Sequence, residues 1–139
     1  MKVERSAGAI IFRIEKGIRK YLLLHYSVGH WEYVKGHIEK GEATETTIRR
    51  EAIEETGIKD LKFITDFKET VQWYFKHEDK LIKKYVVFYL AETKIKEIKL
   101  LSHEHIGYAW LPYEKALEKV TFKSTKDILK KAEKFLSKK

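Results

Sequence analysis

The chain has 139 residues, of which 43% are hydrophobic and 13% aromatic, a composition that predicts one folded domain spanning residues 1–139. Cysteine is absent, which excludes disulfides, thiolate metal ligands and a cysteine nucleophile. The formal net charge of +8 suits an anionic partner such as a nucleotide, a polyphosphate or RNA, but a lysine-rich surface without such a partner would have the same charge.

Residue usage supports two further expectations. The sequence has no secretory segment and no long apolar run, so we expect a soluble, cytoplasmic protein with no membrane partner. Lys and Glu are abundant, Asn is absent, and Gln72 is the only glutamine. Avoidance of thermolabile residues is typical of a thermophile, although a biased genome would produce the same composition.

Two β-rich runs near the start of the chain predict a hairpin. The segments Ser6–Phe12 and Lys20–Ser27 are rich in aliphatic and aromatic residues, and a polar turn lies around Glu15–Arg19. The stretch Gly36–Gly41 is bounded by glycines, and we expect it to be a loop.

The next segment, Thr44–Thr56, has the pattern of an α-helix. Ile48 and Ala52 form an apolar pair four residues apart, and Gly57 stands where a left-handed residue would end the helix. The small side chain of Ala52 would let this helix lie close to a sheet.

The second half of the chain predicts three further strands and a final amphipathic helix. The strands are Phe67–Phe75, Lys83–Thr93 and Tyr108–Tyr113, with an exposed turn at 76–80 between the first two. Apolar residues recur at helical spacing in Ser124–Leu136. The order of strands and helices predicts a mixed α/β domain of about three layers.

Three carboxylates of the first helix are expected to share one face. Glu51, Glu54 and Glu55 are three and four residues apart, so they converge and repel one another unless a cation lies between them. Mg²⁺ prefers such oxygen ligands, and Arg50 could orient one carboxylate by a bidentate bond. The alternative for an isolated cluster is a solvated acidic helix paired with Arg49 and Arg50.

The full spacing around these carboxylates resembles the Nudix box of the Nudix hydrolase family. Its anchors are all present, namely Gly36, Glu42, Arg50–Glu51, Glu54–Glu55, Gly57 and Ile58. Ala52 departs from the pattern, which prefers a bulkier aliphatic residue, and this difference should affect packing rather than chemistry.

The resemblance implies an α/β/α sandwich with a mixed β-sheet. It also implies hydrolysis of a nucleoside diphosphate linked to another group, with Mg²⁺ or Mn²⁺ as cofactor. By motif position, Glu51, Glu54 and Glu55 would bind the metal, helped by a backbone carbonyl near Lys35 or Gly36. The catalytic residues would be Arg50, Glu51 and Glu54, and which glutamate is the general base stays open.

Outside the box, the chain resembles the asymmetric diadenosine tetraphosphate hydrolases within this family. The likeness is carried by His30–Glu42, Leu101–Leu111 and Val120–Lys126. It implies that Glu104 either supplies a further carboxylate to the metal site or handles the water. For His103 and His105 we expect hydrogen bonds that anchor a loop rather than metal ligation.

The same resemblance implies a set of substrate-binding residues. Lys35 and Lys84 would neutralise the phosphates, and His30 would add a hydrogen-bond donor. Phe122 would form one wall of an adenine site, and Trp73 or Tyr74 would form the other. Because neighbouring strand residues point to opposite faces, only one of these two side chains can face the cleft, and the sequence leaves both open.

The resemblance leaves two alternative functions to weigh. A Nudix active site could instead serve a nucleoside triphosphate, ADP-ribose or the 5′ end of an RNA. A binding module without catalysis is the other alternative, but such a module would be free to lose its carboxylates, and this chain keeps them. We expect a monomer that acts on a small nucleotide.

Overall fold

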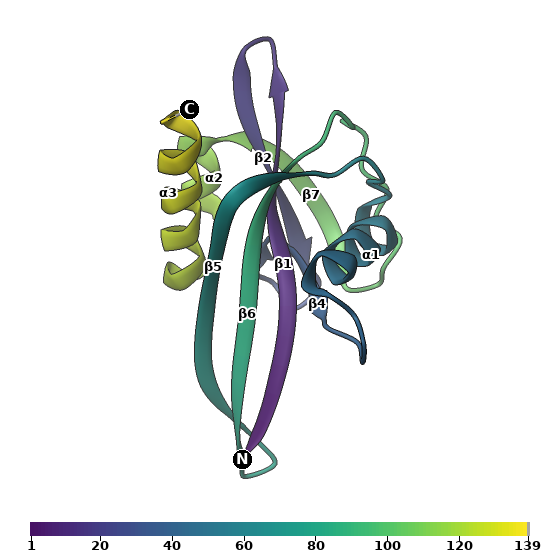
Figure 1. Cartoon of the computed structure of the whole chain (residues 1–139), viewed down its shortest axis with the longest axis vertical. Helices are drawn as coiled ribbons and strands as arrows, with labels where there is room; N and C mark the ends of the chain where they lie inside the picture. Colours follow the sequence, from purple (N-terminus) through teal and green to yellow (C-terminus); the bar gives the residue numbers. More distant parts are fainter. Residues whose placement is uncertain (139) are drawn as a thin grey trace.

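The computed structural model describes residues 1–138 and contains seven strands and three helices among them. In chain order the elements are β1 (Lys2–Glu15), β2 (Ile18–Tyr26), β3 (Trp31–Glu32), β4 (Val34–His37), α1 (Thr44–Thr56), β5 (Lys62–His77), β6 (Lys80–Glu92), β7 (His105–Pro112), α2 (Tyr113–Lys119) and α3 (Lys123–Ser137) (Figure 1). None of the described helices is long and apolar enough to cross a membrane.

The strands form one mixed sheet built around β1. This strand runs parallel to β6, in register from Lys2 opposite Ile82 to Phe12 opposite Glu92. Its other edge pairs antiparallel with β4 and then with β2, and β5 pairs antiparallel with β6. The sheet is completed by β3 and β7, which both pair with β2.

Helices cover both faces of the sheet, so the predicted α/β/α sandwich is confirmed (Figure 1). Residues of β1 alternate between two cores, because successive side chains of a strand point to opposite faces. Ile10 and Phe12 pack in the core that includes residues of α2 and α3. Ala9 and Ile11 pack in the core that includes Ile48 of α1.

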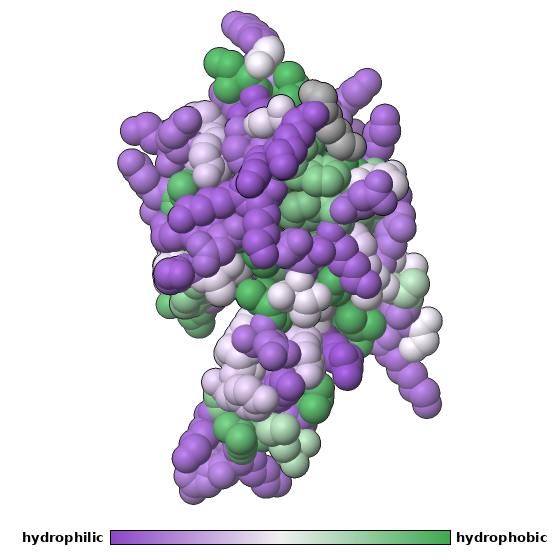
Figure 2. All heavy atoms as spheres, turned by 60° about the vertical axis from the view of Figure 1, so that its left-hand side comes forward, coloured by the Kyte–Doolittle hydropathy of each residue, from purple (hydrophilic) through white to green (hydrophobic). Residues whose placement is uncertain are grey.

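A tight turn joins the two strands of each hairpin, at the positions predicted from the polar segments. Lys16 and Gly17 join β1 to β2 with φ values of 51° and 80°, and Glu78 and Asp79 join β5 to β6 with φ values of 51° and 63°. Positive φ at both central residues matches the twist of the flanking strands. The β5–β6 hairpin projects beyond the helices, and hydrophilic side chains cover most of the face that carries α3 (Figure 2).

The structure differs from the sequence prediction at several elements, most clearly at β4 and α2. Gly36 and His37 belong to β4, where they pair with Ala7 and Ser6, so the expected loop begins later. The short helix α2 was not predicted, because seven residues contain too few turns for a helical period to show. The bounds predicted for α1 are confirmed, and α3 is one residue longer at each end than predicted.

Candidate active site

Helix α1 is held against the sheet by its apolar face and ended by glycine. Ile48 and Ala52 are fully buried, and the small Ala52 leaves room for close contact with the sheet. Gly57 adopts φ 79° and donates its N–H to the Ile53 carbonyl at 3.0 Å, which closes the helix. This packing fixes the position of the helix face that bears Glu51 relative to β4.

Gly36 of β4 allows Glu51 to approach the strand. A Cβ atom at this position would lie 2.1 Å from the carboxyl carbon of Glu51, which is far inside contact distance. Only glycine therefore leaves the space that the Glu51 carboxyl group occupies. The two glycines predicted to bound a loop have different roles, since Gly41 adopts a positive φ of 83° and Gly36 leaves space for the Glu51 side chain.

Arg50 connects the acidic side chains of the site. Its guanidinium binds Glu42 in a bidentate manner, with Nε donating to Oε2 at 2.8 Å and Nη2 donating to Oε1 at 2.9 Å. Its Nη1 donates to Glu51 at 2.8 Å and to Glu54 at 3.3 Å. The hydrogen bond from Arg50 lowers the pKa of Glu42 to about 2. Arg50 thus orients several carboxylates, whereas Arg49 pairs with Glu45 elsewhere on the helix.

Glu55 is a buried carboxyl group with no hydrogen-bond donor among the described residues. It is 3% exposed, and neither Oε atom has a hydrogen-bond partner. His105 Nε2 lies 3.1 Å from Glu55 Oε1, but the angles are not those of a hydrogen bond. Burial, and then the neighbouring Glu51, hold the pKa of Glu55 well above that of an ordinary carboxyl group. An ionised Glu55 would require a nearby cation.

Glu51 and Glu54 line one cavity of about 370 Å³, which we call the acidic cavity, whereas Glu42 and the predicted metal ligand Glu55 do not line it. It is lined by Ser6, Tyr26, Lys35, Gly36, His37, Glu39, Arg50, Glu51, Glu54, Lys84 and Glu104. The fold thus brings together predicted residues from α1, β4, β6 and the segment before β7. It also includes Ser6, Tyr26 and His37, for which no local sequence signal exists.

The oxygen donors at the acidic cavity suit a divalent cation, although the described carboxylates are not arranged around one point. Carboxylate oxygens are the donors that Mg²⁺ and Mn²⁺ prefer, and the unpartnered oxygens of Glu55 would gain from a cation. Within residues 1–138, no group of three or more His, Asp or Glu side chains is already arranged to hold a metal ion. Ion pairs with Arg50 hold Glu51 and Glu54 instead.

The segment before β7 is anchored by its backbone. Ser27 donates its N–H to the Glu104 carbonyl at 2.7 Å, and Glu104 donates its N–H to Ser102 Oγ at 3.1 Å. The prediction that His105 forms loop-anchoring hydrogen bonds is wrong, because among residues 1–138 neither ring nitrogen has a hydrogen-bond partner and the ring is buried against Tyr26. This packing sets His105 beside Glu55.

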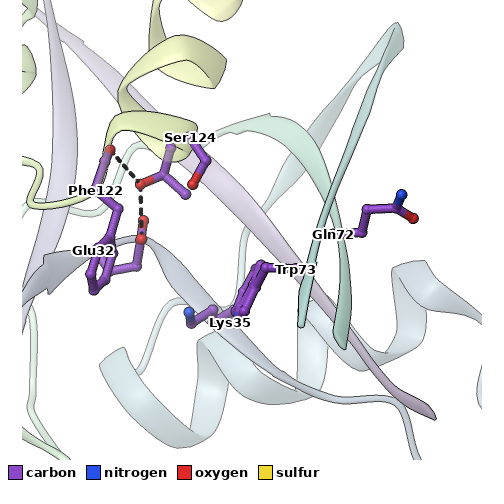
Figure 3. Close-up of a pocket in the computed structure, with 7 residues that line it drawn as sticks. Glu32, Lys35, Gln72, Trp73, Phe122 and Ser124 are labelled. Carbon is purple, nitrogen blue, oxygen red and sulfur yellow. Dashed lines mark hydrogen bonds between the residues drawn. The ribbon is translucent and has the colours of Figure 1, made fainter. Parts of the chain in front are cut away.

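A second cavity of about 290 Å³, the aromatic cavity, adjoins the acidic one. It is lined by Glu32, Lys35, Gln72, Trp73, Phe122, Ser124 and Thr125 (Figure 3). Lys35 lines both cavities, and its Nζ lies 6.0 Å from the Trp73 ring centroid. Trp73 and Phe122 are 37% and 47% exposed, so neither is a core residue.

Of the two candidates for the second wall of the adenine site, Trp73 lines a cavity and Tyr74 does not. Trp73 pairs with Lys84 across the hairpin and faces the aromatic cavity. Tyr74 points to the opposite face, where Lys83 Nζ lies 5.5 Å from its ring, so Tyr74 lines neither cavity. His30 also lines neither cavity. Its ring centroid lies 5.4 Å from that of Phe122 and 4.5 Å from that of Tyr26, and its predicted contact with substrate stays a prediction.

Residues 2–132 match the NUDIX domain family, and the chain therefore belongs to the Nudix hydrolases. The asymmetrical bis(5′-nucleosyl)-tetraphosphatase of Mus musculus is 35% identical over 143 residues, which cover 95% of each chain. The protein of that name in Caenorhabditis elegans is 31% identical, with 97% and 98% of the two chains covered. A crystal structure of the C. elegans Ap4A hydrolase in a binary complex superposes with a TM-score of 0.86, at 30% identity, and covers 98% of this chain and 99% of that chain. These likenesses support nucleotide pyrophosphohydrolase activity.

Proposed function

We propose that the protein hydrolyses diadenosine tetraphosphate asymmetrically, to ATP and AMP, with Mg²⁺ or Mn²⁺. The observation that carries this proposal is that one lysine, Lys35, lines both an aromatic cavity and an acidic cavity. A base site next to a phosphate site suits a substrate with a nucleoside at the end of a polyphosphate. The asymmetrical tetraphosphatases to which the chain is similar act on such a substrate by name.

The side chains divide the work between binding and reaction. Trp73 and Phe122 would stack on the faces of one adenine, and Lys35 and Lys84 would neutralise phosphate charge. Arg50 holds Glu51 and Glu54 in place at the acidic cavity. A divalent cation bound by Glu51, Glu54, Glu55 and Glu104 would stabilise the phosphate charge and lower the pKa of a bound water.

The reaction is the attack of water on phosphorus. The water oxygen forms a new bond to one phosphorus atom, and the bond from that phosphorus to its bridging oxygen breaks. The nucleotide leaving group departs with the bridging oxygen, and the water proton passes to a carboxylate. Glu51 and Glu54 both face the acidic cavity, so either can take this proton.

Product analysis in ¹⁸O water tests the proposal. We expect equal amounts of ATP and AMP from diadenosine tetraphosphate with Mg²⁺, and ¹⁸O in only one of the two products. Two molecules of ADP would contradict asymmetric cleavage. A panel of deoxynucleoside triphosphates, ADP-ribose and triphosphorylated RNA should be cleaved more slowly. Faster cleavage of any of these would assign the site to that substrate instead.

A further inference from the structure

The aromatic cavity contains a buried carboxyl group that neither the metal site nor the phosphate site uses. Glu32 of β3 is 1% exposed, whereas the walls Trp73 and Phe122 are partly open to solvent. Glu32 therefore lies at the closed inner end of this cavity, close to Phe122 (Figure 3). A buried acid at the end of an aromatic slot requires hydrogen-bond partners.

Two partners of Glu32 come from the protein. Oε1 accepts the backbone N–H of Tyr33 at 3.1 Å, and Oε2 lies 2.9 Å from Thr125 Oγ1. Thr125 Oγ1 also lies 3.2 Å from the carbonyl oxygen of Phe122. Burial raises the pKa of Glu32 above that of a solvated carboxyl group. Each carboxyl oxygen has two lone pairs, so one partner on each leaves capacity for a ligand.

Glu32 offers the cavity an acceptor in either protonation state. When it is ionised, Thr125 donates to Oε2 and every free position on both oxygens accepts. When it is protonated on Oε2, this O–H donates a hydrogen bond to Thr125 Oγ1, and the threonine hydroxyl donates to the Phe122 carbonyl. Oε1 then still has one free lone pair beside the Tyr33 N–H. In both cases a ligand can satisfy Glu32 only by donating a hydrogen bond.

We propose that Glu32 is a specificity-determining residue of the aromatic cavity, which selects a base whose edge donates an N–H group, as the exocyclic amino group of adenine does. This assignment rests on the proposed function, because it concerns the base of that substrate. Trp73 and Phe122 would bind the faces of any base, since stacking tolerates all of them. Glu32 would distinguish the bases by their edges.

The test compares two ligands that differ only in the amino group. Dissociation constants are measured by titration for a methylene-bridged diadenosine tetraphosphate and for its counterpart with unsubstituted purine in place of adenine. Neither ligand is hydrolysed, so the comparison does not depend on activity. We expect the wild-type protein to bind the purine ligand about two- to tenfold more weakly, the usual effect of one hydrogen bond. Equal affinities would overturn the proposal.

Variants of Glu32 then show whether this residue causes the preference. Glu32→Gln should keep it, because the glutamine carbonyl can accept from Tyr33 N–H and from ligand while its amide donates to Thr125. Glu32→Leu should bring the affinity ratio close to one. The exposed Glu97→Leu is the matched control and should keep the wild-type ratio. If Glu32→Leu weakens both ligands and leaves their ratio unchanged, Glu32 only anchors α3 and the proposal is wrong.

Two results separate this proposal from the proposed function. If Glu32→Leu does not fold, the affinity ratios of the adenine and purine ligands for wild type and for Glu32→Gln still test the proposal. A preference for adenine that is lost in Glu32→Gln would contradict the acceptor role of Glu32. If the wild-type protein binds neither ligand, both proposals fail. If it cleaves diadenosine tetraphosphate but binds the adenine and purine ligands equally, only the role of Glu32 fails.

Discussion

At the scale of single residues, three glutamates of the Nudix box have three different environments. Glu42 accepts two hydrogen bonds from Arg50, which keep it ionised far below neutral pH. Glu54 is more than half exposed and touches Arg50 at 3.3 Å. Glu55 is buried without a donor. The same amino acid can therefore orient, bind or hold a proton, according to burial and partners.

Glu54→Gln should remove most of the activity and leave the fold intact. The side chain of Glu54 is 56% exposed, so its replacement affects stability little, whereas a carboxylate lost from the cation site weakens stabilisation of the transition state. We expect kcat to fall at least about a hundredfold, which corresponds to roughly 3 kcal/mol. Steady-state kinetics and thermal melts measure both effects. Glu45→Gln, on the same helix, is the control, and near wild-type turnover by Glu54→Gln would refute the metal site.

Glu55→Gln should change how the stability of the metal-free protein depends on pH. Since the folded-state pKa of Glu55 is raised, its contribution is complete below pH 4.5 and is lost as the pH rises toward the folded-state value. We therefore expect the variant to melt above wild type at pH 8 in EDTA and close to it at pH 4. Added Mg²⁺ should raise the melting temperature of wild type more than that of the variant. If the difference in melting temperature between the variant and wild type were the same at pH 4 and pH 8, the pKa of Glu55 would not be raised.

At the scale of elements, the site depends on the contact between α1 and β4. Ile48 and Ala52 attach α1 to the sheet, and Gly36 leaves the space for Glu51 beside β4. A helix alone can bring carboxylates to one face, but the neighbouring strand decides where that face lies. Gly36 has this role because it belongs to β4, although the sequence predicted a loop there.

Gly36→Ala should damage activity more than stability. The new Cβ would displace the end of the Glu51 side chain, which is flexible and can move at little cost in folding free energy. We expect a melting temperature within a few degrees of wild type and a loss in kcat/KM of about tenfold or more. Gly107→Ala is a suitable control, because its Cβ would meet the nearest atom at an ordinary 3.6 Å. Equal kinetics for both variants would show that Glu51 needs no such space.

At the scale of the whole molecule, each face of the β5–β6 hairpin carries a lysine, but only one of these faces meets the acidic cavity. Lys84 lines the acidic cavity on one face. Lys83 lies on the other face, where its Nζ is 4.9 Å from the Tyr85 ring and 5.5 Å from the Tyr74 ring. The net charge of +8 attracts any anion, but only the face with Lys84 leads to the site.

Lys84→Ala should weaken substrate binding and reduce its sensitivity to salt, while Lys83→Ala should do neither. A hydrogen bond to a charged group contributes about 1.5–3 kcal/mol, so we expect KM to rise roughly tenfold or more. KM values at low and high salt for both variants measure this effect. If the two neighbouring lysines behave alike, Lys84 contributes only to the general surface charge.

The elements that were predicted correctly are those whose signals are local. The spacing of Ile48 and Ala52, the glycine at position 57 and the clustered carboxylates all lie within one helix, and the structure confirms the bounds Thr44–Thr56. The hairpin turns were predicted because polar residues interrupt β-rich runs. The short helix α2 and the short strands β3 and β4 were missed, since too few residues carry their pattern.

The sequence by itself determined the family, the α/β/α architecture and the face of α1 that bears the carboxylates, because these depend on spacing along the chain. Only the tertiary structure decided that Trp73 rather than Tyr74 faces the site, that Lys35 lines two cavities, and that Glu32 lies at the end of one of them. These facts depend on strand register and on contacts between residues about 90 positions apart, such as Glu32 with Thr125. A one-residue change in register reverses the face on which every side chain of a strand lies.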